Sequence, residues 1–223
     1  VDADGNYLTE DDGKKTVDED GYYIKTAEGD EIIGNIQPDW NMGIPTTLTF
    51  KGISLNLLVD IQKGGDVYSV NTKYGEATGA YEVTGENNEK GNPKRDLVAD
   101  GGGFLYPETV NEDGSDNTTY VEAFRWGRAY YYNNSPTARY VFDASYVKLR
   151  EVSISYSLPQ SLVDKTPLQS IVFSVIGRNL WIIHKNTEHF DPEASLGSGN
   201  QQGIETGSWP TARTFGFNLK LGI

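Results

Sequence analysis

The sequence predicts an all-β protein built from strands of a transmembrane β-barrel, with long loops outside the membrane. Three observations predict this class. Five segments alternate between apolar and polar residues, which is the period of a strand with one apolar side. The last segment has a wholly apolar face, as a barrel strand in lipid requires. The connections are alternately short and long, which is typical of outer-membrane barrels.

The terminal segment carries the clearest pattern. Its apolar residues are Phe215, Phe217, Leu219, Leu221 and Ile223, and they alternate with Gly216, Asn218, Lys220 and Gly222. The set Thr214, Gly216, Leu219 and Leu221 also resembles the signal that directs barrel assembly in the outer membrane, with Ile223 in place of the usual terminal aromatic. We therefore expect these residues to serve as an assembly signal.

Two earlier segments, 40–50 and 53–61, predict a hairpin that turns at Lys51-Gly52. Pro45 lies inside the first segment and cannot donate a ladder hydrogen bond. It therefore indicates an edge strand, a bulge, or a strand that begins later.

Two further strands are predicted at 145–158 and from 171 to about 183, joined by a proline-bounded turn at 159–167. In the first of them Val147 and Leu149 are out of phase with Val152 and Ile154. Either a bulge lies near Arg150-Glu151, or the upper half of the strand leaves the membrane.

The remaining segments are predicted loops. Residues 1–34 carry eleven carboxylates against three lysines and form an acidic extracellular loop. Residues 35–223 form the barrel strands, with extracellular loops at 71–144 and 186–210; a short helix or hairpin within the first loop is expected around 121–132. If the C-terminus is periplasmic, every short connection falls on the periplasmic side and every long one outside.

Composition excludes several classes of protein. The net charge of −13 argues against a nucleic-acid partner, because an acidic surface repels phosphates. The chain has no cysteine, so thiol chemistry and disulfides are excluded.

Asp60 and Arg178 lie in strands, and we expect both to point into the barrel, because a charge facing lipid costs about 2–4 kcal/mol.

Candidate sites for chemistry are few. Asp2, Asp4 and Asn6 resemble the start of a calcium loop, although Gly13 stands where an EF-hand has glutamate. A structural divalent cation is possible there, against the alternative of a solvated acidic loop, and no other cofactor is expected. Asp191-Pro192-Glu193 suggests a rigid turn rather than a catalytic pair, so no enzyme is predicted.

Several segments resemble the SusC/RagA-type TonB-linked outer-membrane proteins. The matches are collinear over roughly residues 32–223: IIGNIQPDWNMGI, FKGISLNLLVDIQKGGDVYS, DASYVKLREVSISYSLPQSL, GRNLWIIHKNTEHFDPEAS and WPTARTFGFNLKLGI. The resemblance implies a plugged barrel of about 22 strands, of which this chain is the C-terminal part. It also implies an importer of oligosaccharides or oligopeptides in the outer membrane of a Gram-negative bacterium.

The partners implied by the resemblance are the plug and N-terminal strands of the same transporter, TonB, a SusD-like surface lipoprotein and outer-membrane lipid. It also implies that aromatic residues of the long loop line the solute cavity, since ring faces bind sugars. The candidates are Tyr106, Phe124, Trp126, Tyr130 and Tyr132. The alternative is that these rings form the core of a folded loop or contact the partner lipoprotein.

Two other functions are compatible with the composition. A secreted soluble β-module that binds glycans would explain the aromatic residues and the acidity, but not the apolar terminal face. An outer-membrane adhesin would share the barrel and lack the plug and the lid.

Overall fold

The computed structural model describes residues 14–24, 31–106, 108–123, 136–194, 199 and 201–223. The chain divides into two compact units. The strand unit comprises Ile36–Asp66, Asp143–Gly197 and Ser208–Ile223, and the loop unit comprises Val1–Asn35, Val67–Phe142 and Ser198–Gly207. No described helix is long and apolar enough to cross a membrane.

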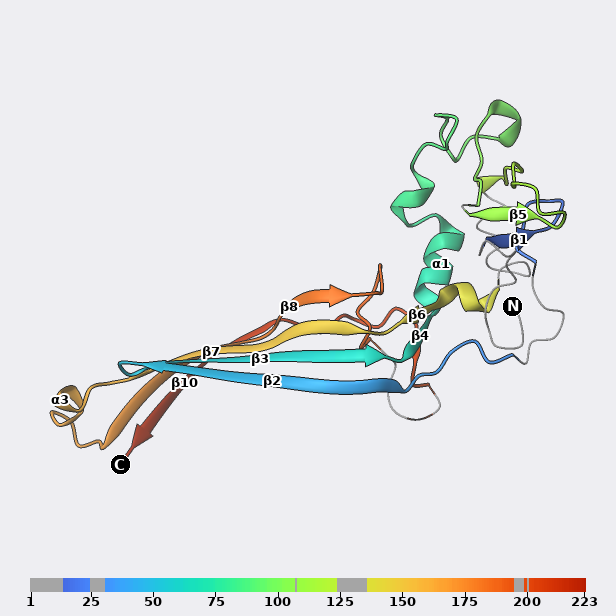
Figure 1. Cartoon of the computed structure of the whole chain (residues 1–223). Coiled ribbons are helices and arrows are strands. Elements are labelled where there is room, and N and C mark those ends of the chain that lie inside the picture. Colours follow the sequence, from blue (N-terminus) through green and yellow to red (C-terminus); the bar gives the residue numbers. More distant parts are fainter. Residues whose placement is uncertain (1–13, 25–30, 107, 124–135, 195–198, 200) are drawn as a thin grey trace. The chain divides into compact units, whose positions relative to one another are not determined.

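The strand unit is a five-stranded antiparallel sheet with the order β10-β8-β7-β3-β2 (Figure 1). Its strands are β2 (Pro38–Phe50), β3 (Ile53–Gly64), β7 (Tyr146–Ser157), β8 (Ser170–Lys185) and β10 (Thr214–Gly222). These are the five segments that alternate in the sequence, so the prediction of five strands is confirmed.

The turn between β2 and β3 has positive φ angles at both central residues, 46° at Lys51 and 84° at Gly52. Such a turn matches the twist of paired strands and sets a tight hairpin. Pro45 lies within β2 and faces Leu58 of β3. Within the described sheet β2 is an edge strand, so the proline lies in the kind of strand that tolerates it.

The short connections lie at one end of the sheet. The β2–β3 turn, the one-turn helix α3 (Gln160–Val163) between β7 and β8, and the C-terminus share that end (Figure 1). The longer connections, from β3 to β7 and from β8 to β10, start and finish at the other end. The predicted grouping of short and long connections is therefore confirmed within this unit.

A β-bulge at Arg150 restores the phase of β7. Leu58 of β3 faces Glu151, whereas the next residue, Val59, faces Leu149, so Arg150 has no partner on β3. The extra residue brings Leu149 onto the same face as Val152. The predicted bulge near Arg150-Glu151 is confirmed.

The register gives the sheet one apolar and one polar face. The apolar face carries Ile44, Leu48, Phe50, Leu55, Leu57, Val59, Leu149, Val152, Ile154, Phe173, Val175, Phe217 and Leu219. Many of these side chains are exposed, Phe217 by 77%. Asp60 and Arg178 lie on the polar face, where Asn56 of β3 bonds Thr47 of β2 at 2.8 Å and Ser153 of β7 at 3.1 Å.

The loop unit has a small core of its own. The buried residues that form it are Val17, Tyr23, Phe104, Tyr106, Val121 and Tyr140. Short parallel strands, β1 (Lys15–Val17) and β5 (Thr109–Asn111), pair beside this core. Within the predicted acidic loop 1–34, the described residues 14–24 are not solvated throughout, because Val17 and Tyr23 pack into the core.

The helix α1 (Val70–Thr78) is tied down at both ends. Ser69 of β4 (Asp66–Ser69) accepts a hydrogen bond from the Thr72 N–H at the helix start, and Gly79 ends the helix at φ 71°. Ser69 also donates to the fully buried Glu205 of β9 (Ile204–Glu205) at 2.6 Å. Near the other end, Glu76 accepts hydrogen bonds from residues of the 3-10 helix η3 (Thr137–Tyr140).

The other described elements are short. They are the 3-10 helices η1 (Glu82–Thr84) and η2 (Val98–Asp100) and the strand β6 (Val141–Asp143), which pairs with β4.

Candidate functional site

The polar face of the sheet carries a network of charged side chains that joins β7 to the loop after β8. Lys148 and Arg150 come from β7, with Lys148 opposite Asp60 of β3 and Arg150 at the bulge. Asp191 and Glu193 come from the loop between β8 and β10. The strand pairing thus positions the cations, and the rigid Asp191-Pro192-Glu193 turn brings both carboxylates to them.

Lys148 is the centre of this network. Its ammonium group forms ion pairs with Asp191 and, at 2.5 Å, with Glu193. The Lys148 and Asp191 side chains are only 4% and 3% exposed. A buried ammonium needs such partners, because an unpaired charge is costly to remove from water.

Arg150 extends the network toward β3. Its Nε donates to Asp60 at 2.7 Å, and its Nη2 forms an ion pair with Glu193. The Tyr146 hydroxyl lies 3.2 Å from the carboxylates of both Asp60 and Glu193. One bulged arginine therefore connects a strand carboxylate to a loop carboxylate.

The loop carboxylates are strongly hydrogen-bonded. Burial alone would raise the pKa of Asp191, but hydrogen bonds from Lys148 and from the Glu193 N–H outweigh it, so the pKa lies below its ordinary value. Burial likewise opposes ionisation of Glu193, and hydrogen bonds from Arg150 and Lys148 hold the pKa of that group low. Both groups are thus stabilised as carboxylates.

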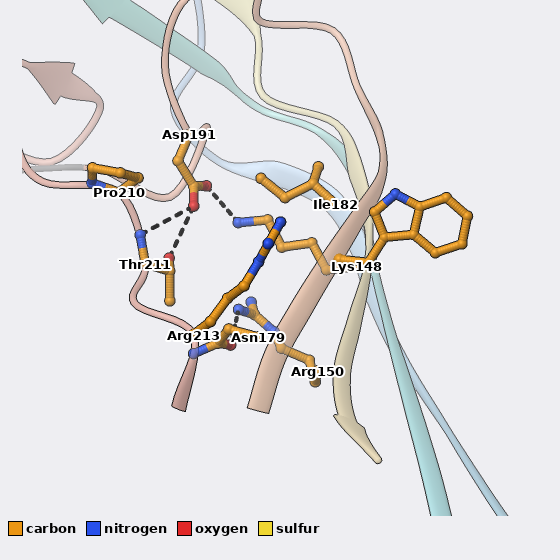
Figure 2. Close-up of a pocket in the computed structure, with 9 residues that line it drawn as sticks. Lys148, Arg150, Asn179, Ile182, Asp191, Pro210, Thr211 and Arg213 are labelled. Carbon is orange, nitrogen blue, oxygen red and sulfur yellow. Dashed lines mark hydrogen bonds and ion pairs between the residues drawn. The ribbon is translucent and has the colours of Figure 1, made fainter. Parts of the chain in front are cut away.

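Beside the network lies a pocket of about 240 Å³ (Figure 2). Its lining residues are Lys148, Arg150, Asn179, Trp181, Ile182, Asp191, Pro210, Thr211 and Arg213. Asn179 accepts from Arg150 at 3.4 Å and donates to the Ala212 carbonyl at 3.1 Å. The arrangement is suited to binding and to fixing a loop, since Lys148, Arg150 and Asp191 of its lining are committed to ion pairs.

The structure places the predicted site residues in different regions. Tyr106 lies in the loop-unit core, 5% exposed, with its ring centroid 4.6 Å from that of Tyr23, as the alternative of a folded loop expects. The other four aromatic candidates, Phe124, Trp126, Tyr130 and Tyr132, lie outside the described residues, as do Asp2, Asp4 and Asn6 and most of the expected element at 121–132.

The predicted assembly-signal residues all lie in β10. Thr214 and Gly216 are on the polar face, opposite Arg178 and Ile176, and Leu219 and Leu221 are on the apolar face. Their role in assembly stays a prediction.

Sequence reasoning missed the ionic network. It assigned Asp191 and Glu193 to a rigid turn and did not consider Lys148 or Arg150 as their partners. A signal was present, because two cations in a strand with an apolar face require carboxylate partners nearby. The separation of Lys148 from Asp191 by 43 residues concealed which carboxylates these are.

No protein-family model matches the chain. It is 31% identical over 206 residues to TonB-dependent receptor P3 of Formosa agariphila and 25% identical over 219 residues to TonB-dependent receptor P26 of the same organism. These alignments cover 89% and 94% of this chain but 18% and 19% of the relatives. The chain therefore spans about a fifth of the length of the curated relatives it matches.

The fold is similar to that of a solved transporter. The match to the RagAB peptide importer in its closed-closed state covers 99% of this chain and 22% of the matched RagAB chain. The TM-score is 0.57 and the sequence identity is 17%. This likeness shows the fold, and the sequence relatives are TonB-dependent receptors. The chain therefore corresponds to part of a SusC/RagA-like TonB-dependent receptor.

Proposed function

We propose that this chain forms part of the barrel wall and external loops of a TonB-dependent importer of oligosaccharides or oligopeptides. The observation that carries the proposal is the exposed apolar face that runs across all five strands. In water such a face would be a large unfavourable surface, whereas in lipid it is the surface a barrel requires.

The dimensions of the apolar face fit a bilayer. Trp40 and Phe50 lie ten residues apart on the apolar side of β2, which is about 33 Å of strand. A tilt of about 40° reduces this height to about 25 Å, the height of the apolar band of outer-membrane barrels. Trp40 and Phe50 would then lie near opposite edges of the apolar band, where aromatic side chains are common.

The polar face would face the barrel interior. Asp60, Glu151 and Arg178 on this face are paired with opposite charges. Asp60 pairs with Arg150 at 2.7 Å, and Glu151 pairs with Arg178 at 2.8 Å. Their placement avoids the cost of charges in lipid. Asp60 and Arg178 then point inward, as their sequence positions predict.

The rest of the transporter would complete the barrel. Within the described sheet β2 and β10 each pair along one edge only, and unpaired edges are not tolerated in lipid. Further strands of the same protein would cover these edges, and its plug would receive energy through TonB. The C-terminus would be periplasmic and the long loops extracellular, beneath a SusD-like lipoprotein lid.

Within this barrel the ionic network would fix the loop after β8. Lys148 and Arg150 bind both carboxylates of the Asp191-Pro192-Glu193 turn, which holds the start of the loop against the wall. In this proposal the chain supplies structure and solute-binding surface to the importer and catalyses no reaction.

Peptide mass spectrometry on the detergent-extracted complex that contains this chain tests the proposal. We expect peptides from further barrel strands and a plug, together with a co-purifying surface lipoprotein. Recovery of the chain in a detergent-free soluble fraction would contradict the proposal and favour a secreted β-module.

A further inference from the structure

We propose that the pocket at the polar face is a subsite for a carboxylate group of the imported solute, with Arg213 as the residue that binds it. The inference rests on the proposed function, because the polar face lines the path of a solute only in a barrel. It goes further by naming the chemical class of the solute.

Arg213 differs from the other cations of the pocket. Lys148 and Arg150 are each bound by two carboxylates. Arg213 lines the same pocket, and among the described residues it makes no hydrogen bond or ion pair. Its guanidinium is always charged and presents five N–H donors, so it is the group in this pocket with free capacity for an anion.

The carboxylate already in the pocket does not satisfy Arg213. Asp191 accepts hydrogen bonds from Lys148 Nζ, the Glu193 N–H, and both the N–H and the hydroxyl of Thr211. These donors occupy its oxygens, as the dashed lines to Lys148 and Thr211 in Figure 2 show in part. An incoming carboxylate therefore meets the unpaired donors of Arg213 rather than a free Asp191.

The charges around the pocket are balanced overall. Three cations (Lys148, Arg150 and Arg213) stand with three carboxylates (Asp60, Asp191 and Glu193). The net charge therefore does not strongly repel an incoming carboxylate. The geometry of the donors on Arg213 then determines whether the carboxylate binds. A planar carboxylate matches the guanidinium fork with two parallel hydrogen bonds.

The walls of the pocket fit the unit that carries the carboxylate. Ile182 and Pro210 supply apolar surface in the pocket that Arg213 also lines, and the volume of about 240 Å³ exceeds that of a lone carboxylate. Apolar walls with a few polar groups are the usual composition of a small-molecule site. An acidic residue of a peptide and a uronic acid of an oligosaccharide both present this chemistry.

The test uses the full-length receptor in detergent and isothermal titration calorimetry. The probes are triglutamate with triglutamine, and trigalacturonate with its methyl ester, so each acid has a neutral counterpart. The variants are Arg213→Gln and Arg213→Lys. Arg178→Gln is the matched control, since it removes an arginine from the same face that is already paired with Glu151.

We expect the wild-type receptor to prefer one acid over its neutral counterpart, and that pair identifies the solute class. Arg213→Gln should weaken binding of that acid at least about tenfold, because a charge-assisted hydrogen-bond pair is lost. Arg213→Lys should retain part of the preference for the acid over its neutral counterpart, because lysine keeps the positive charge. Arg178→Gln should retain all of this preference.

Two results would overturn the inference: no acid preference in the wild type, or a preference that persists in Arg213→Gln. If Arg213→Gln lowers the melting temperature but leaves the preference for the acid probe unchanged, Arg213 pairs with a carboxylate of the transporter itself and does not bind the solute. Failure of the proposed function is distinct, since the chain would then be absent from the detergent-extracted membrane complex.

Discussion

Lys148 and Asp191 form an ion pair in which both side chains are almost completely buried. The pair joins a strand of the barrel wall to the loop that follows the next strand. It makes the Asp191-Pro192-Glu193 turn a structural anchor, since both of its carboxylates bind cations of β7.

Removing one partner of this pair should be strongly destabilising. Asp191→Ala removes one of the two carboxylates that pair with the buried Lys148 and leaves Glu193, so we expect a cost of about 3 kcal/mol, the lower end of the range for breaking a buried pair. The result should be a clearly lower melting temperature of the full-length receptor in detergent. Glu151→Gln is the control, because its pair with Arg178 is exposed and worth about 0–1 kcal/mol. Equal shifts for the two variants would contradict the buried anchor.

The anchor should weaken in acid. The pKa values of Asp191 and Glu193 are held below their ordinary values of 3.8 and 4.5, so folding favours the ionised forms. Their contribution is fully present above the ordinary values and is lost as the pH falls through the lower folded values. A nitroxide label at Glu188 should therefore become mobile only below about pH 4. Mobility already present at pH 7 would argue against an ionic anchor.

The two faces of β10 should respond differently to a charge. Phe217→Arg places a cation on the apolar face, at a cost of about 2–4 kcal/mol near the membrane centre. Asn218→Arg places the same charge on the polar face, opposite Ser174, and should be tolerated. Heat-modifiable gel migration of outer-membrane fractions measures the assembled receptor. Equal assembly of the two variants would contradict the assigned faces.

Tyr106 should act in folding of the loop unit. Tyr106→Ala removes a buried ring, which costs about 3–5 kcal/mol in protein cores. Hydrogen exchange should then rise in the peptides that contain Tyr23 and Val121, its core partners. Unchanged exchange together with weaker solute binding would instead support a direct contact of Tyr106 with solute.

Much of the strand unit follows from the sequence. The five strands and the β2–β3 turn were predictable, because the two-residue period is strong, and the bulge at Arg150 was one of two explanations for the interruption of that period in β7. Asp60 and Arg178 could be assigned to the polar face on the same ground.

The loop unit and the ionic network were harder to predict. β1 and β5 pair over three residues each, too short for a periodic signal, so Val17 and Tyr23 looked like parts of a solvated loop. Asp191 and Glu193, which pair with Lys148 and Arg150, come from a distant loop without a period. Such contacts depend on tertiary structure, and local propensity does not encode them.

The most direct test of the account is the environment of adjacent residues in β10 of the full-length receptor in lipid bilayers. Nitroxide labels at Phe217 and Asn218 would report accessibility to oxygen, which partitions into lipid, and to a water-soluble nickel chelate. The account predicts high oxygen accessibility at Phe217, and at Asn218 lower oxygen accessibility with greater access to the chelate. The reverse order, or high chelate accessibility at both sites, would contradict a lipid-facing apolar side and with it the barrel-wall role.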